Sequence, residues 1–246
     1  GDSIYLQSVV RHLVSKGEEI EVCSDWPDVF RPLNGHVTVS PFRREVDIRA
    51  HYAMRKAEIK TDQFEDCCIA ARIREPVEFK LDWQPVNTEL VKRIRSLGGP
   101  IVAVQLPRRP MDRKDGFGAE LLPNCAVIQR AIDLIRERAH VIQIGSGDAL
   151  HRFDGLALDL SNRTTDTDLI DAAYAVDGML GYVSFFVPLA ESLEKPALFV
   201  WSQRGLESKH EWIRQITPEK ILHRKTSLAV IDTQKLDKAV DEFLDA

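Results

Sequence analysis

The fold is decided by the segment Ile101-Val102-Ala103-Val104-Gln105-Leu106. Its nearly continuous apolar character is typical of a strand that is buried on both faces of a parallel sheet. A helix pattern over 87–97 precedes it and stops at Gly98-Gly99-Pro100, and a second helix pattern follows over 124–138. Helices and strands that alternate at short spacing indicate βαβ units, so we predict an α/β fold.

The alternation continues on both sides of this strand. Downstream, we expect strands at 141–144, 156–158, 176–180 and 197–201, and helices at 166–174, 186–194 and 233–245. Upstream, we expect strands at 19–23 and 36–40 and helices at 3–16, 46–60 and 62–73, followed by a Pro-bounded extended hinge at 75–86. The resulting division is an N-terminal domain 1–86, a C-terminal domain 87–232 and a C-terminal helix 233–246.

The beginning of the chain is unusual for an α/β domain. Gly1-Asp2-Ser3 leads directly into an amphipathic helix pattern, and no strand pattern comes before it. We therefore expect that the first strand of the N-terminal domain is missing from this sequence. A processed or cleaved N-terminus is the alternative.

Composition excludes several classes of protein. The 246 residues are 44% hydrophobic and 29% charged, which is typical of a globular chain and enough for two domains. The net charge of −5 provides no overall basic field for nucleic acid. Four cysteines without metal-binding spacing, no apolar run of membrane-spanning length and no signal peptide favour a cytoplasmic protein. The usual motifs of zinc proteases, serine hydrolases and P-loop enzymes are absent from the sequence.

A basic loop follows the strand at 101–106. It carries Arg108, Arg109, Arg113 and Lys114 and is followed by two glycines. In open α/β sheets, ligands bind at the carboxyl ends of the strands, and guanidinium groups pair well with phosphate oxygens. We predict a diphosphate site here, with a solvated charged loop as the alternative.

Two more turns follow strands and are expected at the same edge. Gly145 lies in a Gly-Ser-Gly turn, for which a structural role and a ligand contact are equally consistent with the sequence. Ser184 and Phe185 stand at the start of the expected helix 186–194, whose first N–H groups favour an anion. Plain core packing of this aromatic turn is the alternative.

Asp2 is the candidate catalytic residue. A carboxylate at a helix N-terminus is kept ionised by the helix dipole and can accept a proton from an attacking hydroxyl. The alternative is a simple helix cap.

Several stretches resemble one family in the family's order. The run from Gly1 to Leu13 resembles the opening loop and first helix of the ADP-heptose:lipopolysaccharide heptosyltransferases, glycosyltransferase family nine, in which a Gly-Asp pair precedes an apolar helix. The runs 158–164 and 168–178 follow in family order. The run 188–201 is similar to the family's His-Leu-Ala-Ala-Ala-Leu-Gly-Lys-Pro segment and the strand after it.

The resemblance implies a GT-B-like fold, with two Rossmann-like domains whose parallel sheets face a cleft. It implies that the C-terminal domain holds a nucleotide-sugar donor, that no metal or cofactor is needed, and that Asp2 is the general base of an inverting transfer. The Arg108–Lys114 loop and the helix start at Ser184 would then bind the diphosphate. The family's Asp-Thr-Gly is Val183-Ser184-Phe185 here and its His is Pro188, so the nucleotide contacts are expected to differ.

We therefore expect a glycosyltransferase that uses a nucleoside diphosphate sugar. The acceptor is a glycan, a lipid-linked glycan or a modified nucleic acid, and the basic segment 43–56 is either its binding surface or a solvated helix face. Two alternatives stay open: a nucleotide-sugar epimerase or hydrolase of the same fold, and a non-catalytic binding or assembly protein.

Overall fold

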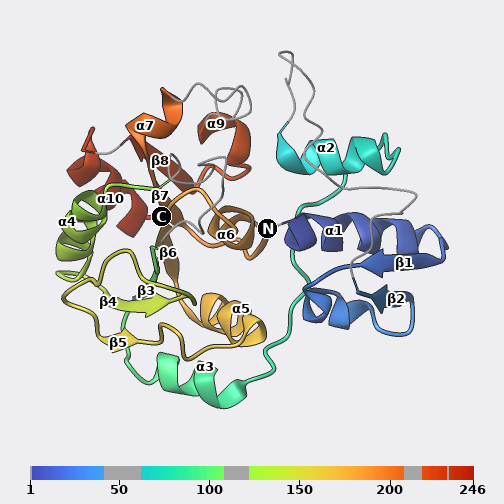
Figure 1. The fold of residues 1–246 in the computed structure, drawn as a ribbon, viewed down its shortest axis with the longest axis horizontal. Coiled ribbons are helices and arrows are strands. Elements are labelled where there is room, and N and C mark those ends of the chain that lie inside the picture. The colour runs from blue at the N-terminus through green and yellow to red at the C-terminus, as the bar shows by residue number, and fades with distance from the viewer. Residues whose placement is uncertain (1, 42–61, 108–121, 208–217, 232) are drawn as a thin grey trace. The chain divides into compact units, whose positions relative to one another are not determined.

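The computed structural model describes residues 2–41, 62–107, 122–207, 218–231 and 233–246. They belong to two compact units, Gly1–Gln84 and Pro85–Ala246 (Figure 1). The expected helix at 46–60 and the basic loop at 108–114 lie outside the described residues.

The second unit is built on a six-stranded sheet. Its strands are β3 (Ile101–Gln105), β4 (His140–Ile144), β5 (Leu158–Asp159), β6 (Gly178–Gly181), β7 (Ala197–Trp201) and β8 (Ser227–Ile231). They lie in the order β5-β4-β3-β6-β7-β8, and every neighbouring pair is parallel. The first strand of the unit is therefore central, which is the strand order of a Rossmann sheet. The predicted α/β class with a parallel sheet is confirmed.

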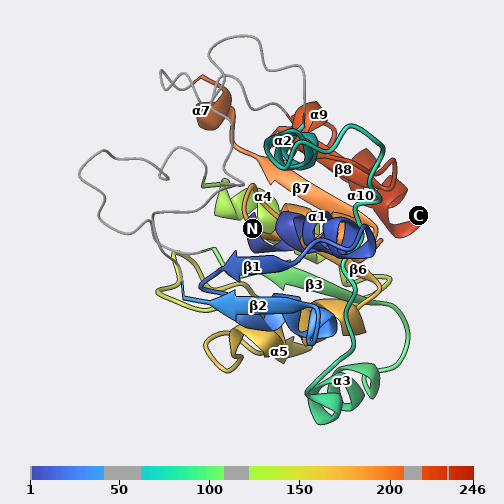
Figure 2. The same ribbon diagram turned by 90° about the vertical axis from the view of Figure 1, so that its right-hand side faces the viewer.

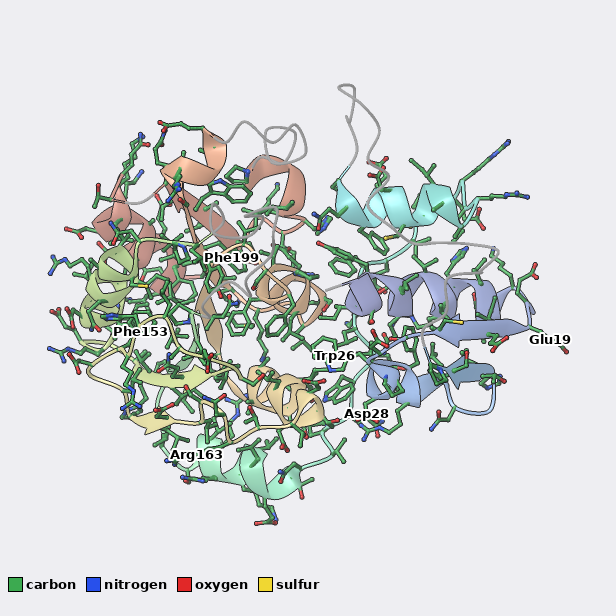
Figure 3. The ribbon with its side chains drawn as sticks, viewed as in Figure 1. Glu19, Trp26, Asp28, Phe153, Arg163 and Phe199 are labelled. Carbon is green, nitrogen blue, oxygen red and sulfur yellow. The ribbon has the colours of Figure 1, made fainter. Side chains whose placement is uncertain are left out.

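Helices cover both faces of this sheet (Figure 1). On one face, α4 (Cys125–Ile135) and α10 (Leu236–Leu244) enclose a core with alternate strand residues such as Val102, Val104 and Leu180. On the other face lie α5 (Asp166–Ala175) and α6 (Phe186–Ser192), and α3 (Thr88–Arg95) packs against α5. Phe199 of β7 is buried inside the unit (Figure 3).

A buried carboxylate fixes the start of the second unit. Asp171 of α5 is fully buried and accepts hydrogen bonds from the backbone N–H of Val86 (3.0 Å) and of Asn87 (2.7 Å). The Asn87 side chain accepts the N–H of Leu90 in the first turn of α3 and donates to Asp168 (2.7 Å). These hydrogen bonds hold residues 86–90 against α5 in one conformation.

The first unit contains a parallel pair of strands, β1 (Ile20–Cys23) and β2 (Val37–Ser40), which run side by side in Figure 2. Around them are α1 (Asp2–Ser15), the 3₁₀ helix η1 (Pro27–Leu33) and α2 (Gln63–Ala70). Tyr5, Phe64 and Phe79 stack in its core, with ring centroids 4.7–6.4 Å apart. The aromatic cluster joins α1, α2 and the chain that follows α2.

That following chain, residues 77–83, has the sequence pattern of a strand but forms its hydrogen bonds with a helix. Its apolar side chains alternate with exposed charged ones. Ser8 of α1 donates to the carbonyl of Lys80 (2.9 Å) and accepts from its N–H (3.1 Å). Gln7 donates to the carbonyl of Asp82 (2.7 Å) and accepts from its N–H (2.9 Å). We expected an extended segment here, and α1 side chains supply the bonds that a neighbouring strand would give.

Some elements differ from the expected ones. The strand expected at 156–158 is Leu158–Asp159, and helix α6 ends at Ser192. The sequence patterns used above did not identify η1, β8, or two single-turn helices, α7 (Gln203–Leu206) and α9 (Pro218–Ile221). None of the described helices is long and apolar enough to cross a membrane.

Candidate active site

The candidate site lies at the carboxyl edge of the six-stranded sheet, where β3 and β6 are neighbours. From β3 the chain continues to β4 on one side, and from β6 it continues to β7 on the other side. Such a reversal of strand order leaves room between the outgoing loops, and ligands of open α/β sheets bind there. The residues at this point are Gln105 at the end of β3 and Gly181 at the end of β6.

The turn after β4 contains the predicted site residue Gly145. Its φ is +136°, and a Cβ at this position would lie 2.8 Å from the Cβ of Leu106. The N–H of Leu106 donates to the carbonyl of Ile144 (2.9 Å), so the chain leaving β3 runs directly against this turn. Glycine is required here for close backbone packing. A ligand contact of Gly145 stays a prediction.

Asn162 connects this turn to the one after β5. Its side-chain oxygen accepts the N–H of Gly147 (2.7 Å), and its amide nitrogen donates to the Gly147 carbonyl (3.2 Å). Its own N–H donates to the carbonyl of Gly145 (2.9 Å). Asn162 adopts a φ of +58°, which asparagine tolerates better than most residues. Two loops of the carboxyl edge are thereby held together.

The loop after β6 contains Ser184 and Phe185. The Ser184 hydroxyl donates to Oε1 of Gln105 (2.9 Å) and accepts the N–H of Phe186 (3.1 Å), the first residue of α6. The ring of Phe185 meets that of Phe186 edge-on at 5.4 Å. The hydroxyl hydrogen of Ser184 is therefore directed at Gln105, so this side chain organises the turn. Diphosphate binding by Ser184 and Phe185 stays a prediction.

Arg108, Arg109, Arg113 and Lys114 lie outside the described residues. The described chain before them ends at Pro107, whose carbonyl accepts the N–H of Leu150 (2.7 Å) in the loop after β4. The chain thus leads into the basic loop from the carboxyl edge. This placement agrees with a phosphate-binding role, which remains a prediction.

Asp2 belongs to the first unit, where it is the first residue of α1. The next residue, Ser3, is hydrogen-bonded through its hydroxyl to the hydroxyl of Ser24 (2.9 Å), directly after β1. The Ser24 oxygen also accepts the N–H of Trp26 (2.9 Å), a residue labelled in Figure 3. The helix therefore begins at the carboxyl edge of the β1–β2 pair. The role of the Asp2 carboxylate as general base stays a prediction.

Two of the cysteines are poorly suited to act as nucleophiles, and the described residues form no three-residue metal cluster. Burial, with Asp62 and Glu65 nearby, raises the pKa of Cys68 to about 11, and burial also raises the pKa of Cys125. Such thiols are protonated at neutral pH and react poorly. Within the described ranges, no three His, Cys, Asp or Glu side chains come together as metal ligands.

Sequence reasoning did not identify Gln105 or Asn162 as parts of this edge. A signal for Gln105 was present, since it is the one polar residue in the run from Ile101 to Leu106. For Asn162, the signal was weaker because asparagine is common in turns of every kind.

No protein-family model and no curated protein sequence matches the chain. Solved structures do match. The ADP-heptose lps heptosyltransferase II of E. coli aligns with a TM-score of 0.51 and 13% identity, over 97% of this chain and 80% of that one. The dodecameric iron-containing heptosyltransferase TibC, in complex with ADP-D-beta-D-heptose, aligns with a TM-score of 0.57 and 11% identity, over 80% of this chain and 55% of that one.

A third match is the glycosyl transferase family 9 protein of Veillonella parvula DSM 2008. Its TM-score is 0.53 and its identity 9%, over 96% of this chain and 70% of that one. This chain thus spans between about half and four fifths of the three proteins. It has the GT-B-like fold of the heptosyltransferases and other family nine glycosyltransferases, as the sequence resemblance implied.

Proposed function

We propose that this chain is a glycosyltransferase that moves a sugar from a nucleoside diphosphate donor to an acceptor hydroxyl. The observation that carries the proposal is the β3–β6 edge of the second unit. Its strand order is that of a nucleotide-binding sheet, and Gly145, Ser184 and the chain entering the basic loop all lie at that edge. The three similar structures are glycosyltransferases, and two of them are named for ADP-heptose.

In the proposed mechanism, the second unit holds the donor. Arg108, Arg109, Arg113 and Lys114 neutralise the charge that develops on the departing diphosphate, with Gly145, Ser184 and Phe185 beside them. Asp2 removes the proton from the acceptor hydroxyl, which attacks the anomeric carbon from the side opposite the leaving group. The anomeric configuration is inverted as a result.

The proposed transfer uses no metal. The arginine and lysine side chains of the basic loop supply the positive charge that a metal would otherwise give to the diphosphate. The similar protein TibC is an iron-containing heptosyltransferase, so activity in the presence of a chelator is the direct test for this chain. The acceptor class remains a glycan, a lipid-linked glycan or a modified nucleic acid.

The experiment that tests the proposal is a thermal-shift and titration panel with ADP, UDP, GDP, TDP and CMP. A ligand that binds only the native state raises its melting temperature. We expect a shift with one nucleoside diphosphate, ADP being the first to test. No shift and no binding heat with any of the five would contradict a donor site.

Asp2→Asn should lower transfer by at least about 100-fold, because an amide cannot accept the proton. Nucleotide affinity should stay unchanged. Initial rates with the selected donor measure the effect, and Asp28→Asn, which changes an exposed carboxylate of η1 (Figure 3), is the matched control. Full activity of Asp2→Asn would remove Asp2 from the mechanism.

The double variant Arg109→Ala, Arg113→Ala should weaken diphosphate binding by about 100-fold, since charge-assisted hydrogen bonds to phosphate are lost. Lys92→Ala, Arg93→Ala removes the same charge from exposed positions of α3 and should change little. Titration calorimetry compares the two. Equal affinities would refute the phosphate assignment.

One observation favours a second candidate, a non-catalytic binding protein. The sequence Val183-Ser184-Phe185 replaces the Asp-Thr-Gly expected from the family resemblance, and the Ser184 hydroxyl hydrogen is already bonded to Gln105. Nucleotide binding without transfer to any acceptor, and without hydrolysis or epimerisation of the donor, would favour this candidate.

A further inference from the structure

Gln105 is a buried polar side chain at the point where the predicted donor loops meet. It is 3% exposed and ends a strand that is otherwise apolar. Val102 and Val104 face the core beneath α4 and α10, so the alternation of the strand places Gln105 on the opposite face, with α5 and α6. Burying an amide is costly unless it forms hydrogen bonds.

Among the described residues, its side chain forms hydrogen bonds with the loop after β6. Oε1 accepts the hydroxyl of Ser184 (2.9 Å) and the backbone N–H of Tyr182 (3.3 Å). Gly181 leaves space for this contact, because a Cβ there would lie 3.0 Å from Oε1 and 2.9 Å from the ring of Phe186. The amide of Gln105 thus lies against the backbone of Gly181 and replaces a side chain that β6 lacks.

These bonds continue into the start of α6. Ser184 donates its only hydroxyl hydrogen to Gln105, which leaves its lone pairs to accept the N–H of Phe186. On the other side, Gln105 is followed by Leu106 and Pro107 and then by the basic loop. Gln105 therefore bonds to loop 182–185 through its side chain and leads towards the basic loop through its backbone.

We propose that Gln105 is a positioning residue of the donor site, which holds loop 182–185 in the conformation that receives the diphosphate. The inference rests on the proposed function, since it assigns Gln105 to the same site. Pre-organising a loop raises affinity because the ligand does not have to order it on binding. The effect should fall on the diphosphate and spare the nucleoside.

Gln105→Met tests the proposal, because methionine keeps the length of the side chain and removes its acceptor. In the ligand-free protein, amide hydrogen exchange over 182–187 should become at least about tenfold faster. The affinity for ADP should fall about tenfold or more, while the affinity for adenosine changes less than threefold. Titration calorimetry measures the first affinity, and ligand-observed NMR the second.

Gln143→Met is the matched control. Gln143 lies in the neighbouring strand β4, is 2% exposed and has an amide nitrogen without a hydrogen-bond partner among the described residues. Its substitution should change neither loop exchange nor ADP affinity. Equal effects of the two variants would show a general loss of packing and would overturn the proposal.

Ser184→Thr and Ser184→Ala separate positioning from folding. Threonine retains the hydroxyl, so Ser184→Thr should keep amide hydrogen exchange over 182–187 near the wild-type rate, whereas Ser184→Ala should accelerate this exchange. In combination with Gln105→Met, Ser184→Ala should add little, because both changes remove the same hydrogen bond. Full additivity would contradict a shared role.

The remaining outcomes are also decisive. If wild-type protein binds no nucleotide, the proposed function fails, and faster exchange in Gln105→Met then limits Gln105 to holding the loop and overturns its donor role. If wild type binds ADP but Gln105→Met shows unchanged exchange or equal losses for ADP and adenosine, the proposed function stands and the assignment of Gln105 fails.

Discussion

The two units hold extended backbone in place by different means. In the second unit, β3 pairs on both sides with parallel strands, and its hydrogen bonds join backbone to backbone. In the first unit, residues 77–83 are held by Gln7 and Ser8, two side chains of a helix that are both fully buried. Backbone pairing survives most substitutions, whereas side-chain pairing depends on individual residues.

This difference predicts where each unit is vulnerable. A sheet distributes its hydrogen bonds over every residue of its strands, so no one side chain controls them. Gln7 alone supplies three bonds, to Asp82 in both directions and to the carbonyl of Val29 (2.8 Å). Replacing a single buried polar residue should therefore lower the stability of the first unit more than it lowers the stability of the sheet.

Gln7→Leu should have the largest effect. It leaves the carbonyls of Val29 and Asp82 and the N–H of Asp82 without partners, which costs about 3 kcal/mol. Peptide-resolved hydrogen exchange should show loss of protection over 77–83 first. Gln143→Leu, at a buried glutamine within the sheet, is the control and should be close to neutral. Similar losses in both variants would remove the distinction between the units.

Asp171→Asn tests the place where the second unit also depends on a side chain. Oδ2 accepts from both Val86 and Asn87, and Oδ1 also accepts from Val86 (3.2 Å), so the amide keeps one acceptor, loses the negative charge and turns its NH₂ group towards the Val86 N–H; the unit should lose about 2 kcal/mol. Chemical denaturation measures the change in the free energy of unfolding, and amide hydrogen exchange at 86–90 shows whether protection is lost there. Asp166→Asn, on an exposed residue of the same helix, should change stability by less than about 0.5 kcal/mol. Unchanged stability of Asp171→Asn would contradict a fixing role of the Asp171 carboxylate.

Glu191→Gln should have the smallest effect, and of opposite sign. Glu191 of α6 is fully buried, and neither carboxylate oxygen has a hydrogen-bond partner among the described residues. Burial raises its pKa, and the nearby charges of His223 and Arg224 oppose this only in part. A raised pKa in the folded state means that stability is lost as the pH rises from the usual glutamate value through the raised one.

The glutamine variant avoids this loss, so it should be more stable than wild type by about 1 kcal/mol at pH 8. The gain should disappear near pH 3, where Glu191 is protonated in both the folded and the unfolded wild-type protein. Calorimetric melting between these pH values measures it, with Glu194→Gln, at a partly exposed ion pair with Arg224, as the control. A gain that is independent of pH would point to packing as the cause.

The sequence predicted most strands of the six-stranded sheet well, and it did not predict the hydrogen-bonding partner of residues 77–83. Apolar runs such as 101–106 and 197–201 identify buried strands because a parallel sheet buries both faces. Residues 77–83 alternate as a strand does, but they form hydrogen bonds with side chains of helix α1. The periodicity of a sequence shows which side chains are buried, and it does not show which element supplies the hydrogen bonds. Strand β8 was not recognised, although Ser227–Ile231 is largely apolar.

The candidate site was predictable in position but not in detail. Parallel strands end at one edge, so Gly145 and Ser184 were expected together, and the structure places both there. The hydrogen bond from Ser184 to Gln105 joins residues 79 positions apart, which no local pattern encodes. The roles of Asp2 and of Arg108, Arg109, Arg113 and Lys114 remain predictions.

The central place of β3 also has a consequence for synthesis of the chain. It is the first strand of its unit to leave the ribosome, but β4 follows about 35 residues later and β6 more than 70 residues later. At ~5–20 residues per second, the run Ile101–Leu106 waits several seconds before both neighbours exist. An apolar strand with two unpaired edges is prone to aggregation during that interval. The strand that organises the finished sheet is thus the one that nascent-chain chaperones would most need to shield.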